Sequence, residues 1–178
     1  MSETQKYWFA ARTRDKQEFA ICKSLSRLKS EEHLDVDYYL PTRIVVSQLK
    51  YRRKRSEVPV IRNLVFIRTT KQTACDISNI YNVPLFYMKD LSTHSMLVVP
   101  DKQMEDFRFL LDFSEEAVEM TNENIKAGDL VRVVKGSLRG MEGELIRHKG
   151  VTKVLVRIDM LGCAMVNIPA SFVEKLNK

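Results

Sequence analysis

The chain has 178 residues, 44% of them hydrophobic and 29% charged, enough for one or two globular domains of ordinary size. No run of eighteen apolar residues occurs, and the first residues lack the apolar core of a signal peptide, so we expect no membrane span and a cytoplasmic location. The three cysteines lie far apart, which argues against a disulfide framework or a CxxC metal site. We expect buried or half-buried thiols, no metal and no cofactor.

The net charge of +6 is concentrated in one short segment. Residues 50–55 alone supply five positive charges, from Lys50, Arg52, Arg53, Lys54 and Arg55. A charge run of this kind is either a solvated surface or a surface that binds phosphates. The protein is therefore better described as carrying a basic patch than as basic throughout.

The first part of the chain predicts alternating strands and helices. An apolar run at 7–11 predicts a buried strand. Asp15, three residues before Glu18, is the capping-box pattern for a helix start. The apolar stripe of that helix is expected to comprise Phe19, Cys22, Leu25 and Leu28.

Further elements continue this pattern. We expect a strand within 35–48 with a bend at Pro41, then the basic segment at a hairpin tip, and the next strand at 64–67. A short helix or turn at 76–81, a strand at 83–88 and a helix beginning at Pro100 complete the first block. In that last helix, Met104, Phe107 and Leu111 share one face.

The periodicity fades in a polar stretch, which predicts two domains, 1–115 and 126–178, joined by a linker at 116–125. The second domain is short, rich in strands and punctuated by glycines. The expected fold class is α+β, with an N-terminal α/β sandwich of an antiparallel sheet and helices, followed by a small β-barrel.

Residues 127–145 read A-G-D-L-V-R-V-V-K-G-S-L-R-G-M-E-G-E-L and resemble the KOW motif. The first domain has a W-aromatic strand, then Pro41-Thr42, the basic tip and an apolar strand after Pro59. Those features, in that order, resemble the N-terminal (NGN) domain of the NusG family of transcription elongation and antitermination factors. In the KOW motif the resemblance implies structural roles for Gly128, Gly136, Gly140 and Gly143.

Two segments depart from housekeeping NusG: Arg62-Asn63-Leu64, and residues 94–105. They are more similar to specialised paralogues such as the UpxY-type regulators of Bacteroides polysaccharide operons and, more distantly, RfaH. The function this implies is operon-specific antitermination, by binding RNA polymerase and suppressing pausing or termination. The alternatives are a housekeeping elongation factor and a ribosome-associated KOW protein that binds RNA.

The resemblance also implies an interaction site for the clamp helices of the largest subunit of RNA polymerase. The residues expected there are Ile61, Leu64, Phe66, Phe86, Met104 and Phe107. From the residues alone, these side chains are better explained as ordinary core, and the resemblance brings the two interpretations level for each residue. A small-subunit ribosomal protein or Rho is the partner implied for the KOW domain.

Two groups of cations are candidates for contact with upstream DNA or the non-template strand. The first is the basic tip, Lys50, Arg52, Arg53, Lys54 and Arg55. The second lies between the first strand and the first helix and comprises Arg12, Arg14 and Lys16. The chain carries no G-x-S-x-G elbow and no G-x-x-x-x-G-K-[ST] loop, and its histidines lack metal-ligand spacing, so we do not expect an enzyme.

Overall fold

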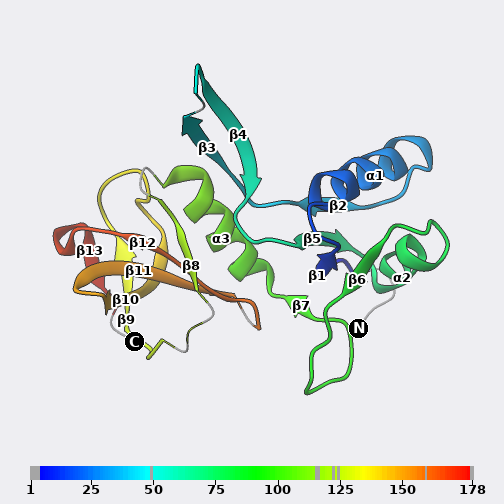
Figure 1. Cartoon of the computed structure of the whole chain (residues 1–178). Helices are drawn as coiled ribbons and strands as arrows, with labels where there is room; N and C mark the ends of the chain where they lie inside the picture. Colours follow the sequence, from blue (N-terminus) through cyan, green and yellow to red (C-terminus); the bar gives the residue numbers. More distant parts are fainter. Residues whose placement is uncertain are drawn as a thin grey trace. The chain divides into compact units, whose positions relative to one another are not determined.

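The computed structural model describes residues 5–48, 50–114, 117–121, 123, 125–158 and 160–176. The chain forms two compact units, Met1–Val99 and Pro100–Lys178 (Figure 1). Within the described residues, no helix combines the length and apolar composition needed to cross a membrane.

The first unit is built on a five-stranded antiparallel sheet. Its strands are β1 (Tyr7–Thr13), β2 (Asp37–Tyr39), β5 (Leu64–Thr69), β6 (Leu85–Tyr87) and β7 (Val98–Val99). The order is β2-β5-β1-β6, and β7 also pairs with β1. Strand β1 is therefore central, which agrees with the buried apolar run predicted at this position.

Helices α1 (Glu18–Glu31) and α2 (Lys71–Asn79) pack on one face of this sheet, where Val65 and Ile67 join the same buried cluster as Ile21 and Ile77. The buried stripe of α1 comprises Ile21, Leu25 and Leu28. The predicted stripe was therefore partly wrong, because Phe19 is 44% exposed and Ile21 takes the central place.

The predicted capping box at Asp15 is also wrong. The residue preceding α1 is Gln17, and no side chain caps the helix. Lys16 adopts a left-handed backbone conformation, with φ 59°, and this tight turn leaves Asp15 outside the helix. Glu18 instead accepts a hydrogen bond from the N–H of Asn63 at 2.7 Å, which ties the start of α1 to the turn before β5.

Strands β3 (Thr42–Gln48) and β4 (Arg53–Pro59) form a separate two-stranded antiparallel sheet that projects from the first unit (Figure 1). Its register runs without interruption from Thr42 opposite Pro59 to Gln48 opposite Arg53. The predicted hairpin is confirmed. The strand expected within 35–48 is divided into β2 and β3, with the buried Pro41 between them.

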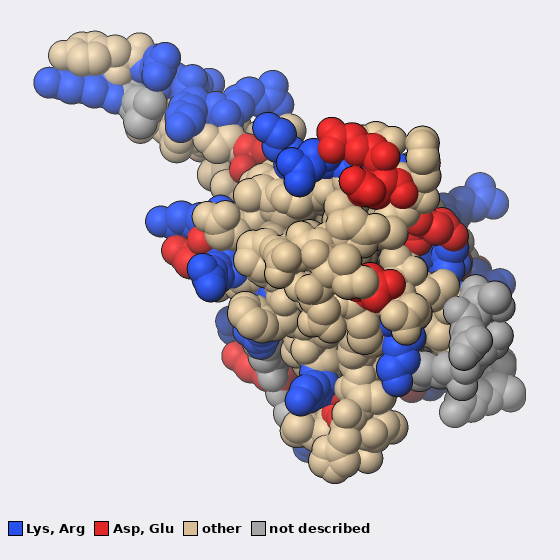
Figure 2. All heavy atoms as spheres, turned by 90° about the vertical axis from the view of Figure 1, so that its right-hand side faces the viewer, with Lys and Arg blue, Asp and Glu red and all other residues tan. Residues whose placement is uncertain are grey.

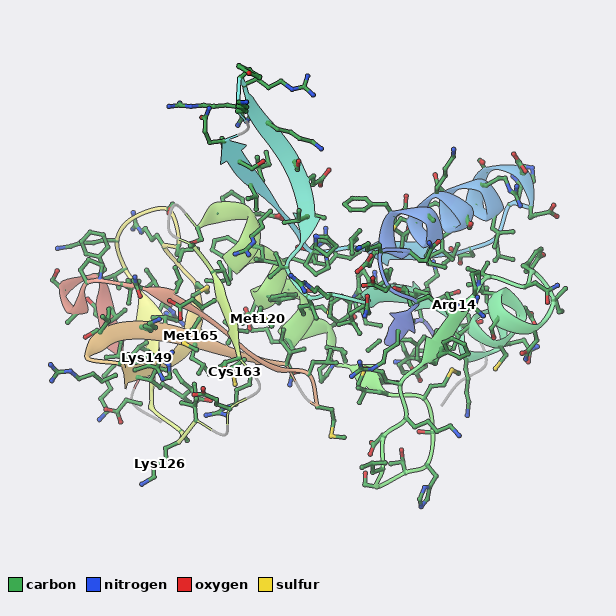
Figure 3. All side chains as sticks on the ribbon, viewed as in Figure 1. Arg14, Met120, Lys126, Lys149, Cys163 and Met165 are labelled. Carbon is green, nitrogen blue, oxygen red and sulfur yellow. The ribbon has the colours of Figure 1, made fainter. Side chains whose placement is uncertain are left out.

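The second unit begins with α3 (Asp101–Phe113), which packs on strand β11. Its six-stranded antiparallel sheet has the order β13-β9-β10-β11-β12-β8. The bounds are β8 (Glu119–Thr121), β9 (Asp129–Val133), β10 (Glu142–His148), β11 (Val151–Ile158), β12 (Gly162–Asn167) and β13 (Val173–Lys175), with a 3-10 turn at Ala170–Phe172. Met120 of β8 pairs with Ala164, which lies between Cys163 and Met165 of β12 (Figure 3), and Met165 packs with Leu155 and Ile146.

The division into compact units falls before α3, whereas the sequence places a linker at 116–125. Helix α3 groups with the C-terminal strands because it packs on β11. Residues 119–121 of the expected linker form β8, which pairs with β12. Residues 115, 116, 122 and 124 lie outside the described part of the chain.

Candidate functional site

The most strongly charged surface is the hairpin of β3 and β4, residues 42–59, which we call the basic ribbon. All five predicted tip cations on it are exposed, and Figure 2 shows lysines and arginines gathered along the projecting arm. Among the described residues, no acidic side chain forms an ion pair with Lys50 or with residues 52–55. Glu57, at the base of the ribbon, accepts a hydrogen bond from Thr42 instead.

The register of the ribbon places its cations on both faces. Residues directly opposite one another point to the same face of an antiparallel pair, so Arg55 shares a face with Val46, and Lys54 shares the other face with Ser47. The first face also carries Ile44, which is 63% exposed. The ribbon therefore has no face buried against the rest of its unit, and both sides are available to a ligand.

The second predicted cationic group lies at the end of β1 and in the turn that follows. Arg12, Arg14 and Lys16 are all exposed, and Figure 3 labels Arg14 at this position. Lys16 lies 3.9 Å from the carboxylate of Asp15, and both side chains are open to solvent. An exposed pair of this kind is weak, so Lys16 remains available to other anions.

The sheet face opposite α1 and α2 brings several predicted polymerase-contact residues together. Across this face, Arg12 lies between Leu64 of β5 and Phe86 of β6. On the same face, Phe66 lies two residues further along β5. The centroid of its ring is 6.4 Å from the centroid of the Tyr39 ring. Arg12, predicted as a nucleic-acid contact, is therefore a neighbour of two predicted protein-contact residues.

Burial divides the predicted polymerase-contact residues into two sets. Leu64, Phe66, Met104 and Phe107 are at most 4% exposed, whereas Phe86 is 63% exposed and Ile61 is half-buried. Met104 and Phe107 share the buried face of α3, in the second unit. In this structure, Phe86 and Ile61 are the two members of the group whose side chains offer surface.

Two different local constraints explain why glycine occupies the four positions predicted in the KOW motif. A Cβ on Gly128 would lie 2.1 Å from the carbonyl oxygen of Leu145, and one on Gly143 would lie 2.7 Å from Val154. Gly136 and Gly140 have φ angles of 81° and 93°, in the region that disfavours side chains. The first two glycines permit close packing between strands, and the other two shape the connection between β9 and β10.

The second unit contains an ion pair between Arg157 and Glu144 that the sequence did not predict. The guanidinium of Arg157 donates to both carboxylate oxygens of Glu144, and its Nη2 also donates to the carbonyl oxygen of Ile125 at 3.0 Å. Glu144 in turn accepts from the N–H of Gly128 at 3.0 Å. The hydrogen bonds from Arg157 hold the pKa of Glu144 below its usual range. This network fixes the segment that leads into β9.

The cysteines lie where they were expected. Cys22 and Cys75 are half-buried, Cys163 is buried, and all three are free thiols. Burial and, to a smaller extent, the charge of Glu18 raise the pKa of the Cys22 thiol to about 11, so this thiol is protonated at neutral pH. In the part of the chain that the structure describes, no group of three or more His, Cys, Asp or Glu side chains could hold a metal ion.

Comparison with known proteins identifies the family. A family model described as "Transcription termination factor nusG" matches residues 6–108, which is more than half of the chain. The structure "Domain interaction in Thermotoga maritima NusG" is similar over 97% of this chain and 98% of that chain, with a TM-score of 0.53 and 18% identity. That likeness supports the fold.

A weaker likeness is to "Crystal Structure of MjSpt4:Spt5 complex conformation A", with a TM-score of 0.33, 16% identity, and coverage of 96% of this chain and 99% of that chain. A TM-score this low does not establish a shared fold. No curated protein sequence matches the chain. On the strength of the family match, the chain belongs to the NusG family of transcription factors.

Proposed function

We propose that this protein binds RNA polymerase through the sheet face that carries Leu64, Phe66 and Phe86, and suppresses pausing or termination. The observation that supports this most directly is Phe86, an aromatic side chain 63% exposed on β6, next to Arg12 of β1, which lies between it and the buried Leu64 of β5. Covering a phenylalanine of this exposure would contribute roughly 1–2 kcal/mol to a complex. The clamp helices of the largest subunit are the proposed partner, with the half-buried Ile61 adding to the contact.

The proposed mechanism is a shift between paused and elongating states of the polymerase. A protein that binds the elongating state more tightly raises the population of that state by its difference in affinity. In this proposal the basic ribbon and the group of Arg12, Arg14 and Lys16 contact upstream DNA or the non-template strand. Contacts of cations with phosphates add affinity that does not depend on sequence and weakens as salt rises.

The target is proposed to be a particular class of long operons, such as those for polysaccharide biosynthesis. The departures from housekeeping NusG at Arg62-Asn63-Leu64 and at residues 94–105 support this. Occupancy of the protein along the genome separates the two roles. Enrichment on a few operons supports the specialised role, and uniform occupancy supports a housekeeping factor.

Single-round transcription with purified polymerase tests the activity itself. We expect the protein to shorten pauses and to increase read-through at a terminator, and Phe86→Ala to reduce both effects. Ile80→Ala is the matched control, because Ile80 is 66% exposed and lies at the end of α2, the helix that packs on the opposite face of the sheet. Unchanged pausing with the wild-type protein at saturating concentration would contradict the proposal.

The C-terminal strands are proposed to form a KOW module that binds a small-subunit ribosomal protein or Rho. The residues 127–145 and the close packing at Gly128 and Gly143 support this assignment. Capture of each candidate partner on immobilised full-length protein distinguishes them. Co-sedimentation with ribosomal subunits in the absence of polymerase would instead support a ribosome-associated RNA-binding protein.

A further inference from the structure

Tyr51 lies at the tip of the basic ribbon and has no role in the fold that the structure reveals. It is 87% exposed, the highest value among the exposed large hydrophobic side chains of the described residues. Within that part of the chain its ring stacks on no other aromatic ring. An exposed tyrosine at a hairpin tip gains little from folding, and its ring is free to contact a ligand.

The charge around Tyr51 restricts the chemistry of that ligand. Lys50 Nζ lies 5.4 Å from the centroid of the Tyr51 ring, and Arg52 follows the tyrosine directly. The cations of residues 53–55 continue along β4 without an acidic partner in the described residues. These charges repel one another in the free protein, and a polyanion would relieve that repulsion.

An aromatic ring among cations selects a nucleic acid over other polyanions. Every base has a π-face that stacks on an aromatic side chain, while its flanking phosphates attract lysine and arginine. Lys50 lies over one face of the Tyr51 ring, which leaves the opposite face for a base. Bases in a duplex are already stacked on their neighbours, so the ring fits an unpaired base better than a paired one.

We propose that Tyr51 stacks on an unpaired base of a single-stranded nucleic acid, while Lys50 and residues 52–55 hold the phosphates on either side of that base. The inference rests on the nucleic-acid contact proposed above for the basic ribbon. It adds that the nucleic acid is single-stranded and that Tyr51 contacts the face of a base. Single-stranded DNA and RNA share this chemistry. Both faces of the basic ribbon are open to solvent, so a strand of nucleic acid can run along it.

The test is fluorescence anisotropy of the full-length protein with a labelled 12-nucleotide DNA strand, the same strand as RNA, and the matching DNA duplex. Tyr51→Ala is expected to weaken single-strand binding roughly tenfold and to leave the dependence on salt unchanged, because no charge is removed. Tyr51→Phe keeps the ring and is expected to bind as the wild type does. Phe19→Ala, at another exposed aromatic position, is the control.

A second pair of variants separates the ring from the charges. Replacing Lys54 and Arg55 together with alanine is expected to lower the slope of log affinity against log salt by about 1.4 for a single strand. Tyr51→Trp supplies a direct signal, because the chain has one tryptophan and Trp8 is buried. Emission from this variant is expected to be quenched by the single strand, while emission from the wild type is not.

Three results would overturn the inference: single-strand binding by Tyr51→Ala equal to that of the wild type, a Tyr51→Phe variant as weak as Tyr51→Ala, or an equal loss on the duplex. Tighter binding to either DNA or RNA supports the inference and identifies the strand. Retention of the same variants by immobilised clamp helices is measured in parallel. A wild-type protein that binds the clamp helices but no single strand refutes this inference and leaves the polymerase contact standing.

Discussion

The guanidinium of Arg157 and the carboxylate of Glu144 form a bidentate pair, with Nε to Oε1 at 2.6 Å and Nη2 to Oε2 at 2.9 Å. The two residues lie on adjacent antiparallel strands, β11 and β10, and their side chains are 35% and 17% exposed. Charge-assisted, two-point hydrogen bonds of this kind are strong and directional. The pair also holds the carbonyl oxygen of Ile125 and the N–H of Gly128.

Replacing Arg157 with lysine is expected to destabilise the protein by about 2 kcal/mol, because lysine keeps the charge but cannot donate the two parallel hydrogen bonds. Urea unfolding of the full-length chain measures the change. Arg132→Lys is the control, since Arg132 pairs with Glu142 at an exposed position, with 53% and 38% exposure. A loss below ~1 kcal/mol is expected there, and equal losses for the two variants would refute the assigned role of Arg157.

The free energy of unfolding is expected to fall as the pH drops below about 4.5, the ordinary pKa of a glutamate side chain. Hydrogen bonds from Arg157 lower the pKa of Glu144 in the folded protein. The stability that Glu144 contributes is therefore complete above its pKa in the unfolded chain, and it is lost as the pH falls through its lower pKa in the folded protein. Glu119, paired with the buried Lys153, contributes in the same direction.

The test for Glu144 is the difference between the wild type and Glu144→Gln in urea unfolding at pH 7 and at pH 3. The variant is expected to be less stable at pH 7, and the gap is expected to narrow toward pH 3, because the stability from the charged carboxylate is lost as the pH falls through the lowered pKa of Glu144. A gap that stays constant with pH would show that the charge of Glu144 is not the cause.

Asn63 is expected to tolerate glycine but not valine. Its φ of 58° is left-handed, which costs a β-branched residue roughly 1–2 kcal/mol and costs glycine nothing. Its Oδ1 is buried without a hydrogen-bond partner in the described residues, so Asn63→Gly also removes an unsatisfied atom. Thermal unfolding is expected to show a lower Tm for Asn63→Val only, and an equal fall for both variants would mean that the side chain matters more than the backbone angle.

The elements that the sequence predicts well are those with a strong local signal. The apolar run at β1, the helical spacing of Leu25 and Leu28, and the basic hairpin tip all depend on neighbours in sequence. The apolar run at 64–67 likewise predicted the strand β5, which pairs with β1.

What the sequence did not predict depends on partners that are distant along the chain. Glu18 was assigned to a capping box because that pattern is local, but its carboxylate bonds to Asn63, 45 residues later. Arg157 and Glu144 have no local signature, because cross-strand pairing alone brings them together. Residues 119–121 have a polar, weakly periodic sequence, and they form a strand because the edge of β12 is available to pair with them.

The measurement that tests the central claim most directly is equilibrium binding of the full-length protein to the clamp helices of the largest polymerase subunit. We expect saturable binding that Phe86→Ala weakens about tenfold, since truncation removes most of an exposed aromatic contact. Ile80→Ala, at an equally exposed apolar position, is predicted to bind as the wild type does. Absence of binding by the wild-type protein, or equal binding by the wild type and Phe86→Ala, would contradict the proposed contact.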